Sequence, residues 1–236
     1  MSTRLLGLAD VTPAAEREPI SPERRAFRTG GWDQERFARE QIRGLVRQVF
    51  ASTLPRPVRQ VVFSAVESDT DLRGICMRVG ESLALETLGS IAVVGRHPQI
   101  VAGENIHCAS MPAGVDENRG APLRGAALRW RSNVWLVPVQ EDDKEGVSTA
   151  SVHKHLAQIR SEFQYSILQG PPASCNEATA MAQFADGVVL VLSAQRTRRA
   201  TATQIKRMLE EAQVRILGTV LTDREFPLPE RLYRRL

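Results

Sequence analysis

Residues 61–84 place an apolar strand, a polar turn and a helical pattern in the order that phosphate-binding loops use. In such loops glycines let backbone N–H groups converge on phosphate at the positive end of the following helix. A lysine then neutralises the β/γ oxygens, and a Ser or Thr hydroxyl holds magnesium. This stretch is a nucleotide site only if its turn supplies those groups.

The turn carries the wrong charge for a phosphate ligand. It has no glycine between Ser64 and Arg73, and it contains three carboxylates, Glu67, Asp69 and Asp71. Each carboxylate would repel a phosphate charge about 4 Å away by roughly 1 kcal/mol even in water, and by more in a cleft. The composition of the turn therefore predicts that it does not hold a triphosphate.

No lysine can reach this turn through a change of alignment, because the three lysines lie far downstream: Lys144, Lys154 and Lys206. Arg73 carries a charge, but a planar guanidinium does not replace a compact ammonium. A structural role is the favoured interpretation: Asp69 or Thr70 caps the helix that follows, and acidic residues in its first turn suit the helix dipole.

Strands and helices alternate along the chain, which predicts an α/β fold with a doubly wound, mostly parallel sheet. The expected strands cover residues 61–64, 91–94, 134–139, 165–168, 187–193 and 216–221, and the expected helices 33–50, 72–88, 152–163, 176–184 and 201–212. Ligands of such sheets bind beyond the carboxyl ends of the strands, where the turn after the first strand lies.

Composition divides the chain into three parts. Residues 1–31, with Pro13, Pro19, Pro22 and the pair Gly30-Gly31, are expected to be a flexible leader. Residues 32–223 form the α/β domain with its preceding helix, and residues 224–236 form a basic C-terminal tail. From Arg196 onward ten basic residues stand against five acidic ones, a net charge of +5, which we interpret chiefly as solvated helix surface.

The composition is that of a cytoplasmic protein. No apolar run is long enough to span a bilayer, no secretion signal is visible, and the three cysteines, Cys76, Cys108 and Cys175, are expected to be reduced. His153 and His155 have no accompanying ligand cluster, so no metal site is predicted.

Four stretches resemble a known family: "EQIRGLV" (residues 40–46), "VVFSA" (61–65), "FQYSILQGPP" (163–172) and the closing residues 185–223. Together they are similar to the cytoplasmic P-loop domain of bacterial tyrosine kinases of exopolysaccharide and capsule biosynthesis, a branch of the MinD/ParA-like deviant Walker class. The resemblance covers roughly residues 35–222 and implies a P-loop NTPase-like α/β fold.

The resemblance also shows which of the family's chemical groups this sequence lacks. Gln169 stands where the family has an aspartate that helps organise magnesium, and Gly95 begins a Gly-Arg-His-Pro stretch in place of the second acidic motif. A tyrosine-rich tail is missing, since the only tyrosines are Tyr165 and Tyr233. The positions implied as a vestigial nucleotide site are Ser64, Ala65, Asp69, Thr70, Asp71, Arg73 and Gln169.

The first helix resembles the family's E-x-x-R-x-x-R helix, which mediates subunit contacts in ring-shaped oligomers. Glu40 and Arg43 match, whereas the third position is Val46 with Arg47 one step later. The resemblance implies an oligomer or partner contact through Glu40, Arg43 and Arg47. On residue chemistry alone, Glu40 and Arg43 are equally an i,i+3 pair on a helix surface.

A chain that keeps the family's fold but lacks its phosphoryl-transfer groups is predicted to be a non-catalytic pseudo-kinase or pseudo-ATPase, with no catalytic residue and no cofactor. By resemblance its partner is the cytoplasmic tail of a membrane chain-length regulator or an active kinase paralogue, so that it reaches the inner face of the membrane only through that partner.

Two alternatives stay open. One is a kinase or ATPase that binds ATP and magnesium at an unconventional site, in which Arg73 holds phosphate and Arg196, Arg198 or Arg199 approaches the nucleotide. The other is a ParA-like binder of nucleic acid or membrane surface through the basic C-terminal segment, including residues 230–236, and nucleic acid is not favoured.

Overall fold

The computed structural model describes residues 34–51, 57–95, 123–139 and 149–223. Its strands are β1 (Gln60–Ala65), β2 (Ile91–Gly95), β3 (Leu128–Arg129), β4 (Val134–Pro138), β5 (Tyr165–Gln169), β6 (Gly187–Ser193) and β7 (Ile216–Thr222). Its helices are α1 (Gln34–Phe50), α2 (Leu72–Glu86), α4 (Leu123–Ala126), α5 (Thr149–Glu162), α6 (Asn176–Phe184) and α7 (Arg199–Glu211). Within these ranges every predicted strand and helix is present.

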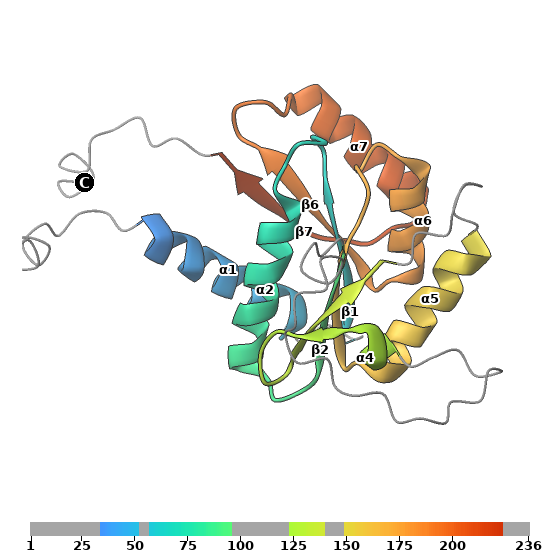
Figure 1. The fold of residues 1–236 in the computed structure, drawn as a ribbon. Helices are drawn as coiled ribbons and strands as arrows, with labels where there is room; N and C mark the ends of the chain where they lie inside the picture. Colours follow the sequence, from blue (N-terminus) through green and yellow to red (C-terminus); the bar gives the residue numbers. More distant parts are fainter. Residues whose placement is uncertain (1–33, 52–56, 96–122, 140–148, 224–236) are drawn as a thin grey trace, which may run out of the picture. The chain divides into compact units, whose positions relative to one another are not determined.

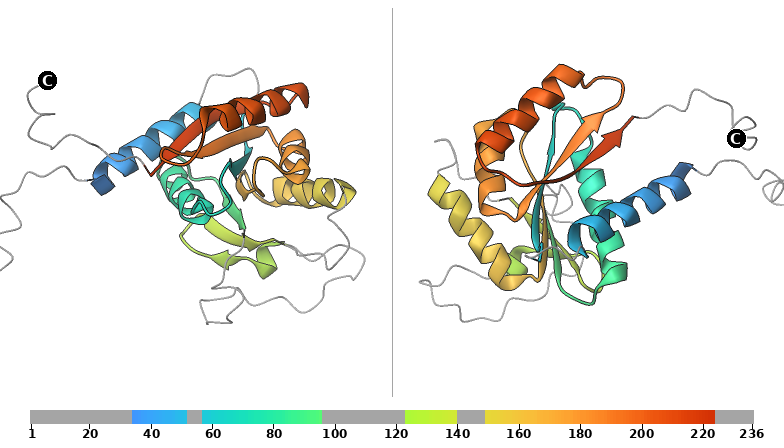
Figure 2. Two further views of the ribbon diagram at one scale, coloured as in Figure 1. Left: turned by 90° about the horizontal axis from the view of Figure 1, so that it is seen from above. Right: turned by 180° about the vertical axis from the view of Figure 1, so that it is seen from behind.

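The strands form one sheet in the order β3-β4-β2-β5-β1-β6-β7. All neighbouring pairs are parallel except β3, which runs antiparallel to β4 at the edge of the sheet. Figure 1 shows α1 and α2 on one face of the sheet and α5, α6 and α7 on the other, and the two views of Figure 2 agree. The predicted doubly wound, mostly parallel α/β fold is confirmed.

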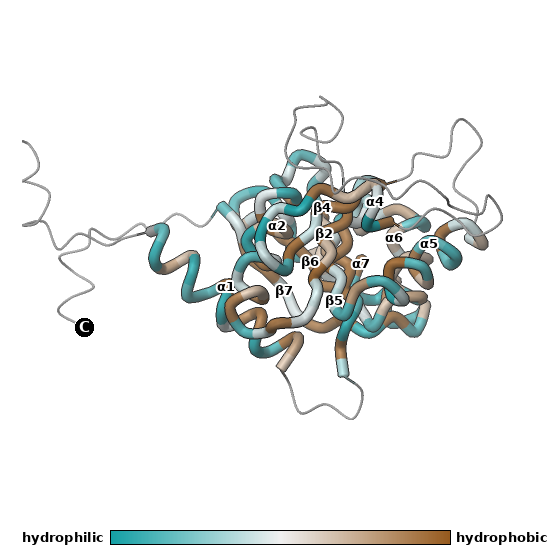
Figure 3. The backbone as a smooth tube through the Cα atoms, turned by 60° about the horizontal axis from the view of Figure 1, so that its bottom comes forward, coloured by the Kyte–Doolittle hydropathy of each residue, from teal (hydrophilic) through white to brown (hydrophobic). Residues whose placement is uncertain are grey.

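The sheet has a hydrophobic core on each face because its central strands are apolar on both sides. All six residues of β1 are buried; Val61 and Phe63 pack toward α1 and α2, whereas Val62 packs toward α5, α6 and α7. Strand β6, the apolar run of residues 187–193, is likewise almost wholly buried, as expected for a central parallel strand. Figure 3 shows apolar residues on the central strands and polar residues over most of α1.

Parallel pairing brings distant strand ends to one edge of the sheet. Phe63 of β1 is in register with Gln169 of β5, and Ala65 with Val191 of β6. The turns that follow β1, β5 and β6 therefore meet at the carboxyl edge, where the sequence placed its candidate site.

The predicted elements differ from the observed ones mainly at their ends. Helix α2 stops at Glu86 instead of residue 88, and α5 and α7 begin two or three residues earlier than expected. The two-residue β3 and the four-residue α4 were not predicted, because elements this short carry no readable period. The predicted leader, residues 1–31, and the predicted tail, residues 224–236, lie outside the described residues.

Candidate functional site at the carboxyl edge

The residue that caps α2 is Asp71. Its Oδ1 accepts a hydrogen bond from the backbone N–H of Gly74 at 2.9 Å, which satisfies one of the free N–H groups at the helix start. The expectation that Asp69 or Thr70 caps this helix was wrong, and so was the expected acidic first turn, because α2 has no acidic residue there. The helix begins at Leu72, one residue later than a Thr70 cap would require.

Gly74 leaves the space that the Asp71 carboxylate occupies. A Cβ atom built on Gly74 would lie 2.1 Å from Asp71 Oδ2 and 2.9 Å from its Cγ. The glycine of this segment therefore makes room for the protein's own carboxylate, whereas glycines of a phosphate loop make room for a ligand.

Asp69 forms an ion pair with Arg196, which follows β6. The hydrogen bond from the Arg196 guanidinium holds the pKa of Asp69 below its ordinary value. Arg196 also feels the charges of Glu67 and Asp223, and its pKa is raised by these carboxylates, by Asp69 first. The arginine considered above as approaching a nucleotide is thus paired with Asp69 and lies in the electrostatic field of two further carboxylates.

The turn after β5 is bound to the end of β1. Ser64 Oγ donates a 2.6 Å hydrogen bond to the carbonyl of Pro171, and the N–H of Ala173 donates to the carbonyl of Ala65 at 2.8 Å. Ser64 is fully buried, so its hydroxyl serves this contact between loops. Both residues implied as vestigial nucleotide contacts in β1 are therefore engaged within the chain.

Gln169 ends β5 beside Gly95, the last residue of β2. Its Oε1 lies where a Cβ of Gly95 would be only 2.3 Å away, so the amide lies against the end of the neighbouring strand. A neutral amide cannot act as a base, and it offers magnesium a weaker ligand than a carboxylate. Arg73, in the first turn of α2, is half-buried and takes part in contacts of its own.

The structure thus brings the predicted site residues of β1, the following turn and β5 to one edge of the sheet. What they form there is a set of contacts within the chain, with carboxylates at the start of α2 and in the preceding turn. The negative charge of these carboxylates favours positively charged groups, such as the chain's own arginine, and disfavours an anionic ligand.

The predicted contact residues of α1 lie on a largely exposed helix. Glu40 accepts a 3.4 Å bond from Arg36, one turn earlier, while Arg47 donates to Glu86 at the end of α2 at 3.0 Å. Arg43 is exposed. Glu40 is therefore paired toward the N-terminus of α1, and Arg47 holds α1 against α2.

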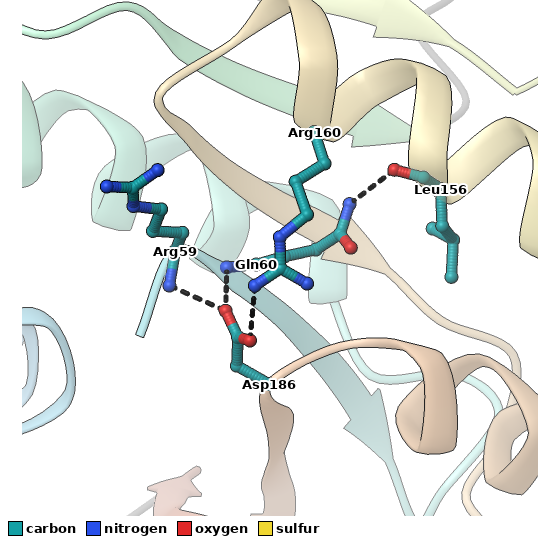
Figure 4. Close-up of polar contacts among 5 residues, drawn as sticks. All are labelled: Arg59, Gln60, Leu156, Arg160 and Asp186. Carbon is teal, nitrogen blue, oxygen red and sulfur yellow. Dashed lines mark hydrogen bonds and ion pairs between the residues drawn. The ribbon is translucent and has the colours of Figure 1, made fainter. Parts of the chain in front are cut away.

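Sequence reasoning missed a polar cluster around Asp186, at the opposite edge of the sheet (Figure 4). Asp186 Oδ2 accepts bonds from the backbone N–H groups of Arg59 and Gln60, and its Oδ1 pairs with Arg160 of α5 at 2.5 Å. The side chain of Gln60, fully buried, donates to the carbonyl of Leu156 at 3.1 Å. The available signal was an acidic residue directly before a buried strand, and its role is structural.

The described residues offer neither a metal centre nor a membrane-spanning helix. They contain no group of three His, Cys, Asp or Glu side chains that could hold a metal ion. None of the helices in these ranges combines the length and apolarity needed to cross a membrane.

Comparison of the sequence with protein-family models and with curated proteins gives no match. Solved structures do match. The chimerical protein CapA2B2 is similar with a TM-score of 0.61 and 14% identity, over 77% of this chain and 83% of that one. The kinase domain of the Escherichia coli tyrosine kinase ETK is similar with a TM-score of 0.57 and 12% identity, over 81% and 79% of the chains.

A third similar structure is the cell division protein MinD of Aquifex aeolicus, with a TM-score of 0.52 and 14% identity over 75% of this chain and 73% of that one. At such identities the shared property is the fold. The predicted resemblance to bacterial tyrosine kinase domains and to the MinD class is confirmed at that level.

Proposed function

We propose that this chain, which has the fold of bacterial tyrosine kinase domains and of MinD, is a non-catalytic member of that fold. It acts by binding another protein of exopolysaccharide or capsule biosynthesis, either the cytoplasmic tail of a membrane chain-length regulator or an active kinase paralogue. The partner class comes from fold analogy, whereas the loss of catalysis is argued from the residues of the site.

One observation carries the proposal: the start of α2 is capped by the chain's own carboxylate. Asp71 accepts the N–H of Gly74, and its position excludes a phosphate from the same donor. Asp69 adds a second negative charge in the preceding turn and binds Arg196. A triphosphate entering here would displace two favourable contacts and meet like charge.

The groups that catalyse phosphoryl transfer are replaced as well. Transfer depends on placed positive charge, a metal ion and an acidic residue to position them. Gln169 supplies a neutral amide at the strand end, and no lysine precedes Lys144 in the sequence. Without these groups, the domain would act by binding a partner protein through its surface.

The surface proposed for the partner is the exposed side of α1. Arg43 is exposed there, and Arg36 and Arg39 form ion pairs with Glu40 and Glu35 of the same helix, at 3.4 and 3.1 Å. Such i,i+4 pairs are weak and open readily to a competing charge. An acidic segment of a partner can therefore bind this face, and the same face can contact a second copy.

Titration calorimetry of the purified full chain with ATP–Mg and ADP–Mg tests the loss of nucleotide chemistry. We expect no binding heat and no release of phosphate. An active kinase domain of the same fold, titrated under identical conditions, is the positive control. Tight binding with turnover that disappears in Arg73→Ala would refute the proposal and favour the ATPase alternative.

The binding role has a separate test. The full chain is titrated against the purified cytoplasmic tail of a chain-length regulator and against a kinase paralogue from the same genome. Arg43→Glu should weaken the complex, whereas Lys206→Glu, a change at another exposed basic residue, on α7, should leave it unchanged. Equal effects of the two variants would contradict a contact through α1.

A further inference from the structure

Three loops meet around Arg196. The guanidinium pairs with Asp69 of the β1–α2 turn, lies within the field of Glu67 of the same turn, and also feels Asp223, which follows β7. Arg196 itself lies in the β6–α7 connection. Beyond the strands, one positive side chain thus links connections that are far apart in sequence.

The same turn carries a second fixed contact at its other end. Asp71 caps α2 through the N–H of Gly74, and Gly74 has no side chain that could push this carboxylate aside. Asp69 and Asp71 therefore hold the turn at both sides, one against an arginine and one against a helix start. An arginine and a helix N-terminus are two of the groups that recognise phosphate in proteins.

We propose that Asp69 and Asp71 are built-in substitutes for an anionic ligand, and that they keep the β1–α2 and β6–α7 loops in one closed arrangement without nucleotide. In a protein switched by a ligand, loop order depends on ligand binding. Here the carboxylates belong to the chain itself, so the contacts that a bound anion would make are present at all times. The inference rests on the proposed function and adds that the binding-competent shape is constitutive.

The proposal predicts that the β1–α2 and β6–α7 loops are coupled through the pair of Asp69 and Arg196. The side chains of Asp69 and Arg196 are 54% and 57% exposed, so their pair contributes little to global stability, and the readout has to be local. Removing Asp69 should loosen the β6–α7 loop, which it does not touch through the backbone. If the ion pair did not couple the two loops, the mobility of the β6–α7 loop would not change.

Hydrogen exchange followed by mass spectrometry on the full chain measures this. In the wild-type protein, exchange in residues 64–76 and 193–199 should be the same with and without ATP–Mg or inorganic phosphate. Asp69→Asn should accelerate exchange in both segments, and Asp71→Ala should accelerate the first by about fivefold, the effect of losing one helix cap. Glu210→Gln, which removes an exposed pair with Lys206 on α7, is the matched control and should change neither segment.

Arg196→Gln closes a double-mutant cycle. If the pair couples the loops, Arg196→Gln alone should reproduce the effect of Asp69→Asn, and the double variant should add nothing further. Additive effects, or unchanged exchange of residues 193–199 in Asp69→Asn, would overturn this inference and leave the proposed function intact. Slower exchange of the wild-type loops on adding ATP–Mg would overturn both.

Discussion

Asp186 and Arg160 form a 2.5 Å ion pair that joins the start of β6 to helix α5. The same carboxylate accepts the backbone N–H groups of Arg59 and Gln60 at 2.7 and 2.8 Å, and the Asp186 side chain is only 19% exposed. One residue therefore contacts the starts of two largely buried central strands, β1 and β6, and helix α5. Asp186 is the principal polar contact of the edge opposite the candidate site.

Replacing Asp186 should destabilise the fold strongly. Asp186→Ala leaves two backbone donors and one guanidinium without their acceptor, and we expect a loss of about 2–4 kcal/mol in the free energy of unfolding. Urea denaturation followed by circular dichroism measures it. Glu210→Ala, which breaks only an exposed pair, should change the same quantity by less than about 0.5 kcal/mol. Similar losses in the two variants would contradict the role given to Asp186.

The Asp186 cluster also predicts a pH dependence. Although burial opposes it, hydrogen bonds from Arg59, Gln60 and Arg160 hold the pKa of Asp186 below its ordinary value. The folded state thus binds the proton less tightly than the unfolded state, whose pKa is about 3.9. The stabilisation is fully present above that pH and is lost as pH falls through the lower folded pKa.

Unfolding midpoints of wild type and Asp186→Asn between pH 7 and about pH 2 measure this dependence. The difference between the two proteins should be constant above about pH 5 and should shrink in the acid range. A difference that stays constant throughout would show that the carboxylate is not bound as described.

Two glycines in helices should respond oppositely to alanine. A Cβ at Gly80 of α2 would lie 2.7 Å from Val93 Cγ2 in β2, whereas a Cβ at Gly44 of α1 would meet nothing within 4 Å. Gly80→Ala should cost about 1–3 kcal/mol through overpacking of the helix against the sheet. Gly44→Ala should stabilise by about 0.5–1 kcal/mol, because alanine favours a helix. Thermal unfolding of both variants checks the pair, and a Gly80→Ala variant as stable as wild type would contradict the packing of α2 against β2.

The two described cysteines should differ in reactivity. Burial raises the pKa of the Cys76 thiol, which lies in the core, whereas Cys175 is exposed. In a Cys108→Ser background, a thiol reagent should label Cys175 rapidly in the native protein. It should label Cys76 only after the protein is unfolded. Mass analysis of the labelled peptides distinguishes them. Rapid labelling of Cys76 in the native protein would mean that α2 opens readily from the sheet.

The sequence by itself determined the fold class, because the order of apolar runs and helical periods leaves few topologies. The buried run of residues 187–193 predicted a central strand, and β6 is one. It also determined what the turn after β1 lacks, since the three carboxylates of this turn and its lack of lysine and glycine are set by the residues themselves.

Only the tertiary structure decided how the acidic turn is used. Asp71, and not Asp69 or Thr70, caps α2, because the choice among adjacent capping residues depends on where the backbone leaves β1. Asp69 is free for Arg196, a partner 127 positions away that the parallel pairing of β1 with β6 brings alongside. Long-range pairs of this kind, like the Asp186 cluster, leave no spacing in the sequence, because sheet order and register determine which loops meet.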